Sequence, residues 1–128
     1  MPAERTYDYA IIRVVPRVQR GEMMNVGIIL SCADVDFLDA RIELDESRLR
    51  ALDPTVDLEV VGTHLGAILE VCRGGPNAGP IGELPPRDRF RWLVSPRSTI
   101  IQTSPVHTGQ TTDPAACLER LMDQMVRV

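Results

Sequence analysis

The stretch that decides the fold is Tyr7–Cys32, YDYAIIRVVPRVQRGEMMNVGIILSC. It holds two apolar, β-forming segments, Tyr7–Val15 and Val26–Cys32, which are joined by a charged loop. Both sides of the first segment are largely apolar, and this pattern favours a central strand. Pro16 has no backbone N–H to donate to a sheet, so it predicts the end of that strand. Gly27 inside the second segment predicts a β-bulge or a close neighbour.

A third strand is predicted over Phe37–Leu44, because apolar and polar residues alternate strictly along it. The residues expected to point inward are Leu38, Ala40, Ile42 and Leu44. Since short connections join the three predicted strands, an antiparallel meander is the simplest arrangement.

The helices are predicted from start signals and apolar periodicity. A short helical turn is expected over Asp45–Leu52, and a long helix over Pro54–Arg73 that lies on the sheet. Gly62 and Gly66 would let that helix approach the sheet or another chain closely. A C-terminal helix opens at Asp113-Pro114, where an N-cap residue precedes proline.

The region between the two long helices is less regular. Residues 74–86, GGPNAGPIGELPP, predict a mobile loop because glycine and proline dominate and no periodicity is present. Strands are expected at Arg87–Val94 and around Ile100–Ile101, with a short helix as the alternative for Arg87–Val94. The expected fold is α+β. A single domain (1–128) forms a mostly antiparallel sheet of four to five strands, with the long helix and the C-terminal helix covering one face.

Composition narrows the class of protein. The 128 residues are 44% hydrophobic and 25% charged, as in a soluble globular domain. The net charge of −4 disfavours nucleic acid as a partner. Cys32, Cys72 and Cys117 are expected to be buried thiols, and no cysteine or histidine cluster indicates a metal or another cofactor. No signal pattern and no apolar run of about 20 residues is present, so a cytoplasmic protein without membrane contact is expected.

Two separated runs carry a resemblance to a known family. They are YAIIRVVPRVQRGEMMNVGIILSC and RWLVSPRSTIIQTSPVHTGQTTDP, followed by a leucine-rich helix. Together they resemble a bacterial family catalogued as a domain of unknown function, number 3037 in that series. The resemblance implies a small cytoplasmic protein with no established activity. It also implies a possible partner, because members tend to be encoded beside a kinase-like protein of the HipA type.

The second run presents polar groups that suit an anion. Arg97, followed by Ser98 and Thr99 after a proline, could offer a guanidinium, hydroxyls and amides to a phosphate or carboxylate. The alternative is that Arg97 pairs with a carboxylate of this domain such as Glu22. His107 could act as a general acid or base, or could be a hydrogen-bonded structural histidine.

The first run adds a loop that carries its own polar groups. Glu22 and Asn25 supply too few ligands for a hard cation, so they are expected to fix the loop. Arg13 emerges from an apolar strand and needs a partner, for which Glu22 is the candidate. The arginines of 87–91, interleaved with Phe90 and Trp92, could form a nucleic-acid stripe, but a solvated strand face is the simpler reading.

Two functional hypotheses follow. The first is a non-enzymatic accessory protein that binds a HipA-like kinase, with homodimerisation as a further possibility. The second is a phosphate- or nucleotide-handling enzyme that uses Arg97 and His107 and requires them to converge on Glu22 and Asn25. The predicted ligand or partner surface consists of Arg13, Arg17, Glu22, Asn25, Arg97, Ser98, Gln102 and His107.

Overall fold

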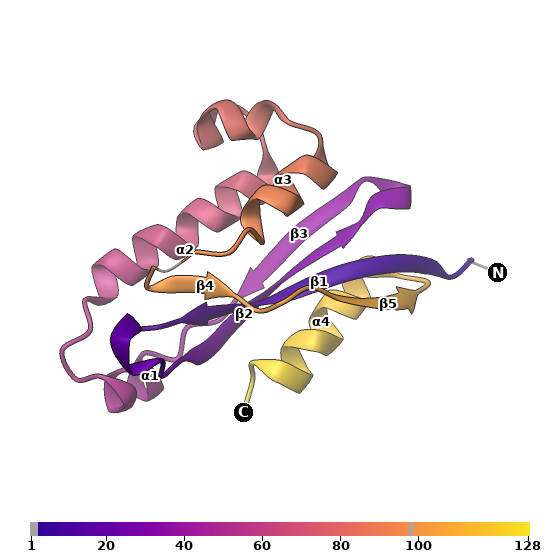
Figure 1. Cartoon of the computed structure of the whole chain (residues 1–128). Coiled ribbons are helices and arrows are strands. Elements are labelled where there is room, and N and C mark those ends of the chain that lie inside the picture. The colour runs from indigo at the N-terminus through magenta and orange to yellow at the C-terminus, as the bar shows by residue number, and fades with distance from the viewer. Residues whose placement is uncertain (1–2, 98) are drawn as a thin grey trace.

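The computed structural model describes residues 3–97 and 99–128. Its first three strands, β1 (Arg5–Val14), β2 (Met24–Cys32) and β3 (Phe37–Ile42), pair antiparallel in the predicted meander. They belong to one five-stranded sheet in which β1 is central (Figure 1). The α+β fold expected from the sequence is therefore confirmed.

The other edge of β1 is covered by two short strands that follow one another. β4 (Ile101–Thr103) pairs with the C-terminal half of β1, and β5 (His107–Thr111) pairs with the N-terminal half. Between them Ser104 is buried, with its N–H donating to the carbonyl of Ile11 and its hydroxyl accepting from the N–H of Ile11. This exchange keeps the edge closed where Pro105 has no N–H of its own to donate.

Gly27 has both of the properties predicted for it. The register between β1 and β2 shifts between Ile12 and Arg13, opposite Gly27, so one residue of β2 bulges out. A Cβ atom at Gly27 would lie 2.5 Å from the carbonyl oxygen of Arg41 on β3, so only glycine fits there.

Three of the helices begin at aspartate caps. Asp113 caps α4 (Pro114–Met125), as predicted, and Asp45 caps α1 (Glu46–Leu52). The long helix α2 runs over Leu58–Arg73 and is capped by Asp57, so the predicted start at Pro54 is wrong. The reason is that Asp53 is engaged elsewhere: its carboxylate accepts hydrogen bonds from Thr55 and holds a turn between the helices.

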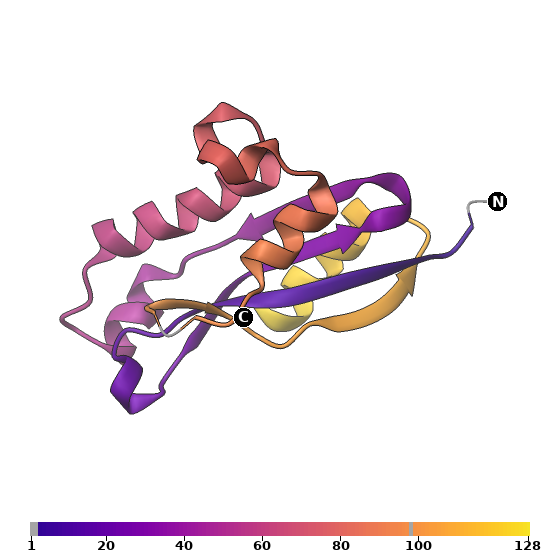
Figure 2. The same ribbon diagram turned by 45° about the horizontal axis from the view of Figure 1, so that its top comes forward.

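Helices cover both faces of the sheet, which corrects the prediction that both long helices share one face. Figures 1 and 2 show α4 on the side of the sheet opposite α2 and α3. The α2/α3 face buries Ile12, Val14, Met24, Val26 and Ile29 of the sheet against Val61, Leu65, Phe90 and Leu93. The α4 face buries Tyr7, Ile28, Leu30 and Cys32 against Cys117, Leu118, Leu121 and Met122. Both faces of β1 and β2 are apolar, and each therefore needs its own cover.

The segment Arg87–Val94, predicted as a strand with a short helix as the alternative, is a helix, α3 (Pro86–Leu93). The strand reading is wrong because the buried residues are three and four apart, at Arg89, Phe90 and Leu93, whereas Trp92 is exposed. Before α3, part of the Gly/Pro-rich loop forms 3-10 turns, η3 (Pro76–Glu83), and its mobility stays a prediction. Two single 3-10 turns, η1 (Val18–Arg20) and η2 (Ala33–Val35), close the connections of the meander.

Arg89 ties α3 to the end of α2. Its guanidinium is buried and donates to the carbonyls of Val71 and Cys72 at 2.7 Å each, while its Nε donates to Leu84. The last carbonyls of a helix have no partner within it, so a buried cation here satisfies groups that would otherwise be costly.

Of the remaining predictions on packing, the one on the cysteines is confirmed and the one on the glycines of α2 is wrong in part. Cys32, Cys72 and Cys117 are all buried free thiols, as expected. A Cβ at Gly62 or Gly66 would meet nothing within 4 Å, so these glycines do not bring α2 closer to the sheet. An approach of a second chain at this helix edge stays a prediction.

Candidate functional site

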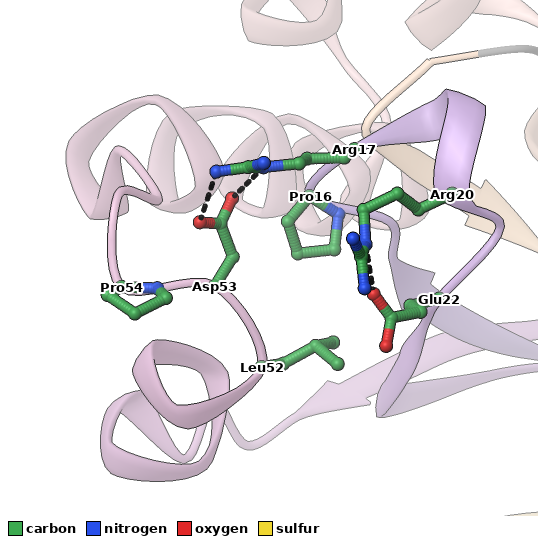
Figure 3. Close-up of a pocket in the computed structure, with 7 residues that line it drawn as sticks. All are labelled: Pro16, Arg17, Arg20, Glu22, Leu52, Asp53 and Pro54. Carbon is green, nitrogen blue, oxygen red and sulfur yellow. Dashed lines mark hydrogen bonds and ion pairs between the residues drawn. The ribbon is translucent and has the colours of Figure 1, made fainter.

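A polar pocket lies where the β1–β2 loop meets the α1–α2 connection (Figure 3). Its volume is about 230 Å³ and it is lined by Pro16, Arg17, Arg20, Glu22, Leu52, Asp53 and Pro54. Two of the predicted surface residues, Arg17 and Glu22, therefore share one site.

Local chain geometry builds the loop side of this pocket. Pro16 follows the end of β1, and the turn η1 then places Arg17 and Arg20 on the loop. Gly21 closes the turn at φ 69°, in the left-handed region that glycine enters without strain. Glu22 follows at once and pairs with Arg20.

The opposite wall is organised by Asp53, whose side chain is buried. Its Oδ1 accepts from the N–H and the hydroxyl of Thr55 at 3.0 and 2.8 Å, and Arg17 lies 3.5 Å from its Oδ2. The hydrogen bonds from Thr55, and then the charge of Arg17, lower the pKa of the Asp53 carboxyl. Asp53 therefore stays ionised.

The pocket balances its own charges. Arg17 faces Asp53 and Arg20 faces Glu22, so each guanidinium has a carboxylate partner within the lining. Because these arginines are half exposed, the pairs contribute little to stability and can exchange partners. The arrangement suits ionic contact with a partner surface.

Three other predicted residues form a row across the sheet. Arg13 on β1 lies opposite Asn25 on β2 and Gln102 on β4. Its Nε donates to Oδ1 of Asn25 at 3.4 Å, and Asn25 donates to the carbonyl of Met125 at the end of α4. The partner of Arg13 is thus Asn25, and the prediction of Glu22 for that role is wrong.

Arg97 and His107 lie on opposite sides of the sheet. Arg97 stacks on Trp92 at 4.5 Å and donates to the carbonyls of Trp92 and Leu93, on the α2/α3 face. The alternative prediction, that Arg97 pairs with Glu22, is therefore wrong. His107 stacks on Tyr9 at 5.3 Å, and Tyr9 packs against the α4 core. Glu22, Asn25, Arg97 and His107 therefore do not form one pocket, and Ser98 lies outside the described residues.

The arginines of residues 87–91, which could have formed a basic stripe, are also dispersed. Arg89 is buried at the end of α2, and Arg87 pairs with Asp8 at 2.8 Å and bonds to Ser31. Arg91 alone of the three is exposed, so the structure offers no continuous basic stripe here.

Sequence reasoning missed a groove between α2 and α3 that is mainly apolar. It measures about 170 Å³ and is lined by His64, Ala67, Ile68, Val71, Trp92, Leu93, Arg97, Thr99 and Ile101. Trp92, the single tryptophan of the chain, is 42% exposed at its rim. A helical reading of 87–94 would have placed Trp92 off the buried face and so would have indicated this surface.

A line of hollows lies next to the groove, and we call the groove and these hollows together the furrow. A hollow at Pro16, Arg17, Asp53, Val60 and Ile100 shares its first three residues with the polar pocket. It shares no residue with the groove but lies next to it, since the carbonyl of Val60 is 2.8 Å from Nδ1 of His64 and Ile100 directly precedes Ile101. Beyond Leu52 the furrow reaches Met23, Met24, Arg48 and Ala51. Met23 and Val60 along this line are 46% and 40% exposed.

Among the described residues, no three histidine, cysteine or carboxylate side chains are placed to hold a metal ion. The described helices include none that is both long and apolar enough to cross a membrane. The Nδ1 atom of His64 lies 2.8 Å from the carbonyl of Val60, which is a common structural role.

The fold and site thus define a single α+β domain with an apolar groove and a charge-balanced pocket along one furrow. Residues 9–126 match the family described as "Protein of unknown function (DUF3037)", and the chain belongs to that family. No curated protein and no solved structure matched the chain.

Proposed function

We propose that the protein is a non-enzymatic accessory protein that binds another protein along the furrow. The observation that carries this proposal is the set of exposed apolar side chains at Met23, Val60 and Trp92 beside neighbouring hollows. Aromatic, methionine and arginine side chains are enriched in protein interfaces, and the furrow presents all three.

The partner that we propose is a kinase-like protein of the HipA type. Its support is the family resemblance, since proteins of this kind tend to be encoded beside such a kinase. The half-exposed Arg17 and Arg20 would exchange their internal carboxylates for those of the partner. No observation favours the phosphate-handling enzyme, because Arg97 and His107 lie on opposite faces of the sheet.

Titration of the purified chain with the purified kinase-like protein from the same genome tests this function. We expect a complex at micromolar concentrations, weakened in the variant Val60→Ser. The matched control is Val35→Ser, since Val35 is equally exposed at 44% but lies in η2, away from the furrow. The absence of any complex with the wild-type chain would remove the kinase as partner.

A further inference from the structure

From the groove between α2 and α3 we infer that the protein recognises a short acidic peptide segment with apolar side chains. This inference rests on the proposed partner-binding function and names the part of the partner that the groove takes. The segment would place apolar side chains against Trp92 and Ile68 and a carboxylate against Arg97.

The apolar half of the inference follows from what lines the groove. Ala67, Ile68 and Val71 of α2 form one wall, and Trp92 and Leu93 of α3 form the other. Trp92 keeps 42% of its surface exposed, although a large aromatic side chain gains much from burial. An occupant with apolar side chains would remove that surface from water.

The charge of the groove indicates that its occupant is acidic. The described residues that line the groove include a guanidinium and an imidazole but no carboxylate, although the chain has 18 acidic residues and a net charge of −4. A groove that is locally positive on an acidic protein complements an acidic occupant.

Arg97 is positioned in advance for this contact. Its guanidinium stacks on the ring of Trp92, and its two terminal nitrogens donate to the carbonyls of Leu93 and Trp92. A guanidinium has five N–H groups, so donors remain for a carboxylate while its plane stays fixed. Asp88 lies one helical turn before Trp92 but outside the lining, so the peptide's carboxylate is expected on the Arg97 side.

The size of the groove favours a peptide over a metabolite. Sites for small molecules usually enclose about 300–1,000 Å³, whereas this groove measures about 170 Å³. It fits one or two side chains. The hollow beyond Val60 gives a peptide room to continue, and because Asp53 and Asp57 line that hollow, the acidic residues of the peptide are expected at the Arg97 end.

Selection of a random 12-residue peptide display library on the purified chain provides the test. We expect the enriched peptides to combine aspartate or glutamate with leucine or aromatic residues. Binding of synthetic, tryptophan-free versions is then followed through the emission of Trp92, which should shift to shorter wavelength because it is the only tryptophan. Versions with lysine in place of each acidic residue should not bind.

The affinity of each protein variant is then measured with labelled peptides. Arg97→Gln should weaken binding about tenfold, as loss of a charged hydrogen bond does, and Arg97→Lys should restore part of it. Trp92→Ala should abolish binding. Arg127→Gln removes the same charge on the α4 side and should bind as the wild type does. Enriched peptides that are neutral or basic, or that bind Arg97→Gln unchanged, would overturn the inference.

Other occupants give different results. An equal emission shift with anionic phosphatidylglycerol vesicles would overturn the inference in favour of a lipid surface. A dimer that is seen by sedimentation and lost in Trp92→Ala would overturn it in favour of a second copy of this chain. If the kinase-like protein binds the double variant Trp92→Ala/Arg97→Gln undiminished, this inference fails while the proposed function stands. If it does not bind the wild type, the kinase proposal fails.

Discussion

On the α4 face of the sheet, a network of ion pairs joins the helix end to the sheet, whereas on the α2/α3 face large apolar side chains stay exposed beside a groove. Arg127 bonds to Glu43, Glu119 and Asp123 at 2.8–3.0 Å and so joins the end of α4 to the sheet. Across the sheet, Val60 and Trp92 are 40% and 42% exposed beside open hollows. A hollow of about 450 Å³ also lies at the end of α4, but its lining includes the charged residues Glu43, Asp45, Arg48 and Arg127. The two faces therefore differ in what they leave open: a charged hollow on one and a mainly apolar groove on the other.

The substitutions with the largest expected effect on stability test whether a packed core lies on both faces of the sheet. Phe90 of α3 and Leu118 of α4 are both fully buried, on opposite sides of the sheet. Phe90→Ala and Leu118→Ala should each lower the free energy of unfolding by about 3–4 kcal/mol, because each removes burial and leaves a cavity. Urea denaturation measures both, and a cost below about 1 kcal/mol for Leu118→Ala would mean that α4 is not part of the core.

A second substitution tests the buried cation of the α2/α3 face. Arg89→Met removes the donor to Val71, Cys72 and Leu84 and should cost about 3 kcal/mol, since buried carbonyls lose their partners. The control Arg91→Met, two residues away on the same helix but exposed, should change the stability by about 0.5 kcal/mol or less. Equal costs in urea denaturation would contradict the capping role.

Trp92 is expected to matter less for stability than its size suggests. Trp92→Ala should cost about 1 kcal/mol, because it loses the stack on Arg97 and only part of its burial. The same substitution should abolish peptide binding. Thermal unfolding and labelled-peptide binding measured on one preparation would separate the two roles, and a cost equal to that of Phe90→Ala would make Trp92 a core residue.

The smallest effect is expected at the charged border of α4, and it depends on pH. Hydrogen bonds from Arg127 and Arg41 lower the pKa of the Glu119 carboxyl in the folded protein. A lowered pKa stabilises the fold above the unfolded value of about 4.3, and this contribution is lost as the pH falls through the folded value.

Urea midpoints of the wild type and Glu119→Gln measure this contribution. The difference between the two proteins at pH 7 should shrink as the pH falls below about 4. A difference that stays constant with pH would show that the ion pairs of Glu119 do not contribute to the stability.

Much of the fold could be predicted because local patterns determine it. The alternation in Phe37–Leu44, the cap-plus-proline signal at Asp113 and the glycine at position 27 each have a local cause. The cap and the glycine are confirmed, and the strand is confirmed over Phe37–Ile42, two residues shorter than predicted. The choice of face for α4 could have been predicted too, since both sides of β1 and β2 are apolar and need cover.

The candidate site was harder to predict because it depends on tertiary contacts. Nothing local shows that Arg89 turns inward to the end of α2 or that Asp53 bonds to Thr55 instead of capping a long helix. The pairing of the β1–β2 loop with the α1–α2 connection, which brings Arg17 to Asp53, is likewise set by the whole sheet. Residues with suitable chemistry could be named from the sequence, but the sides of the sheet they occupy could not.

The most direct measurement of the central claim is amide hydrogen exchange of this chain with and without its bound partner protein. The account predicts new protection in α2, α3 and residues 99–101, with exchange in α4 and β3 unchanged. Protection confined to α4 and β3, with Trp92 and Val60 unaffected, would contradict it.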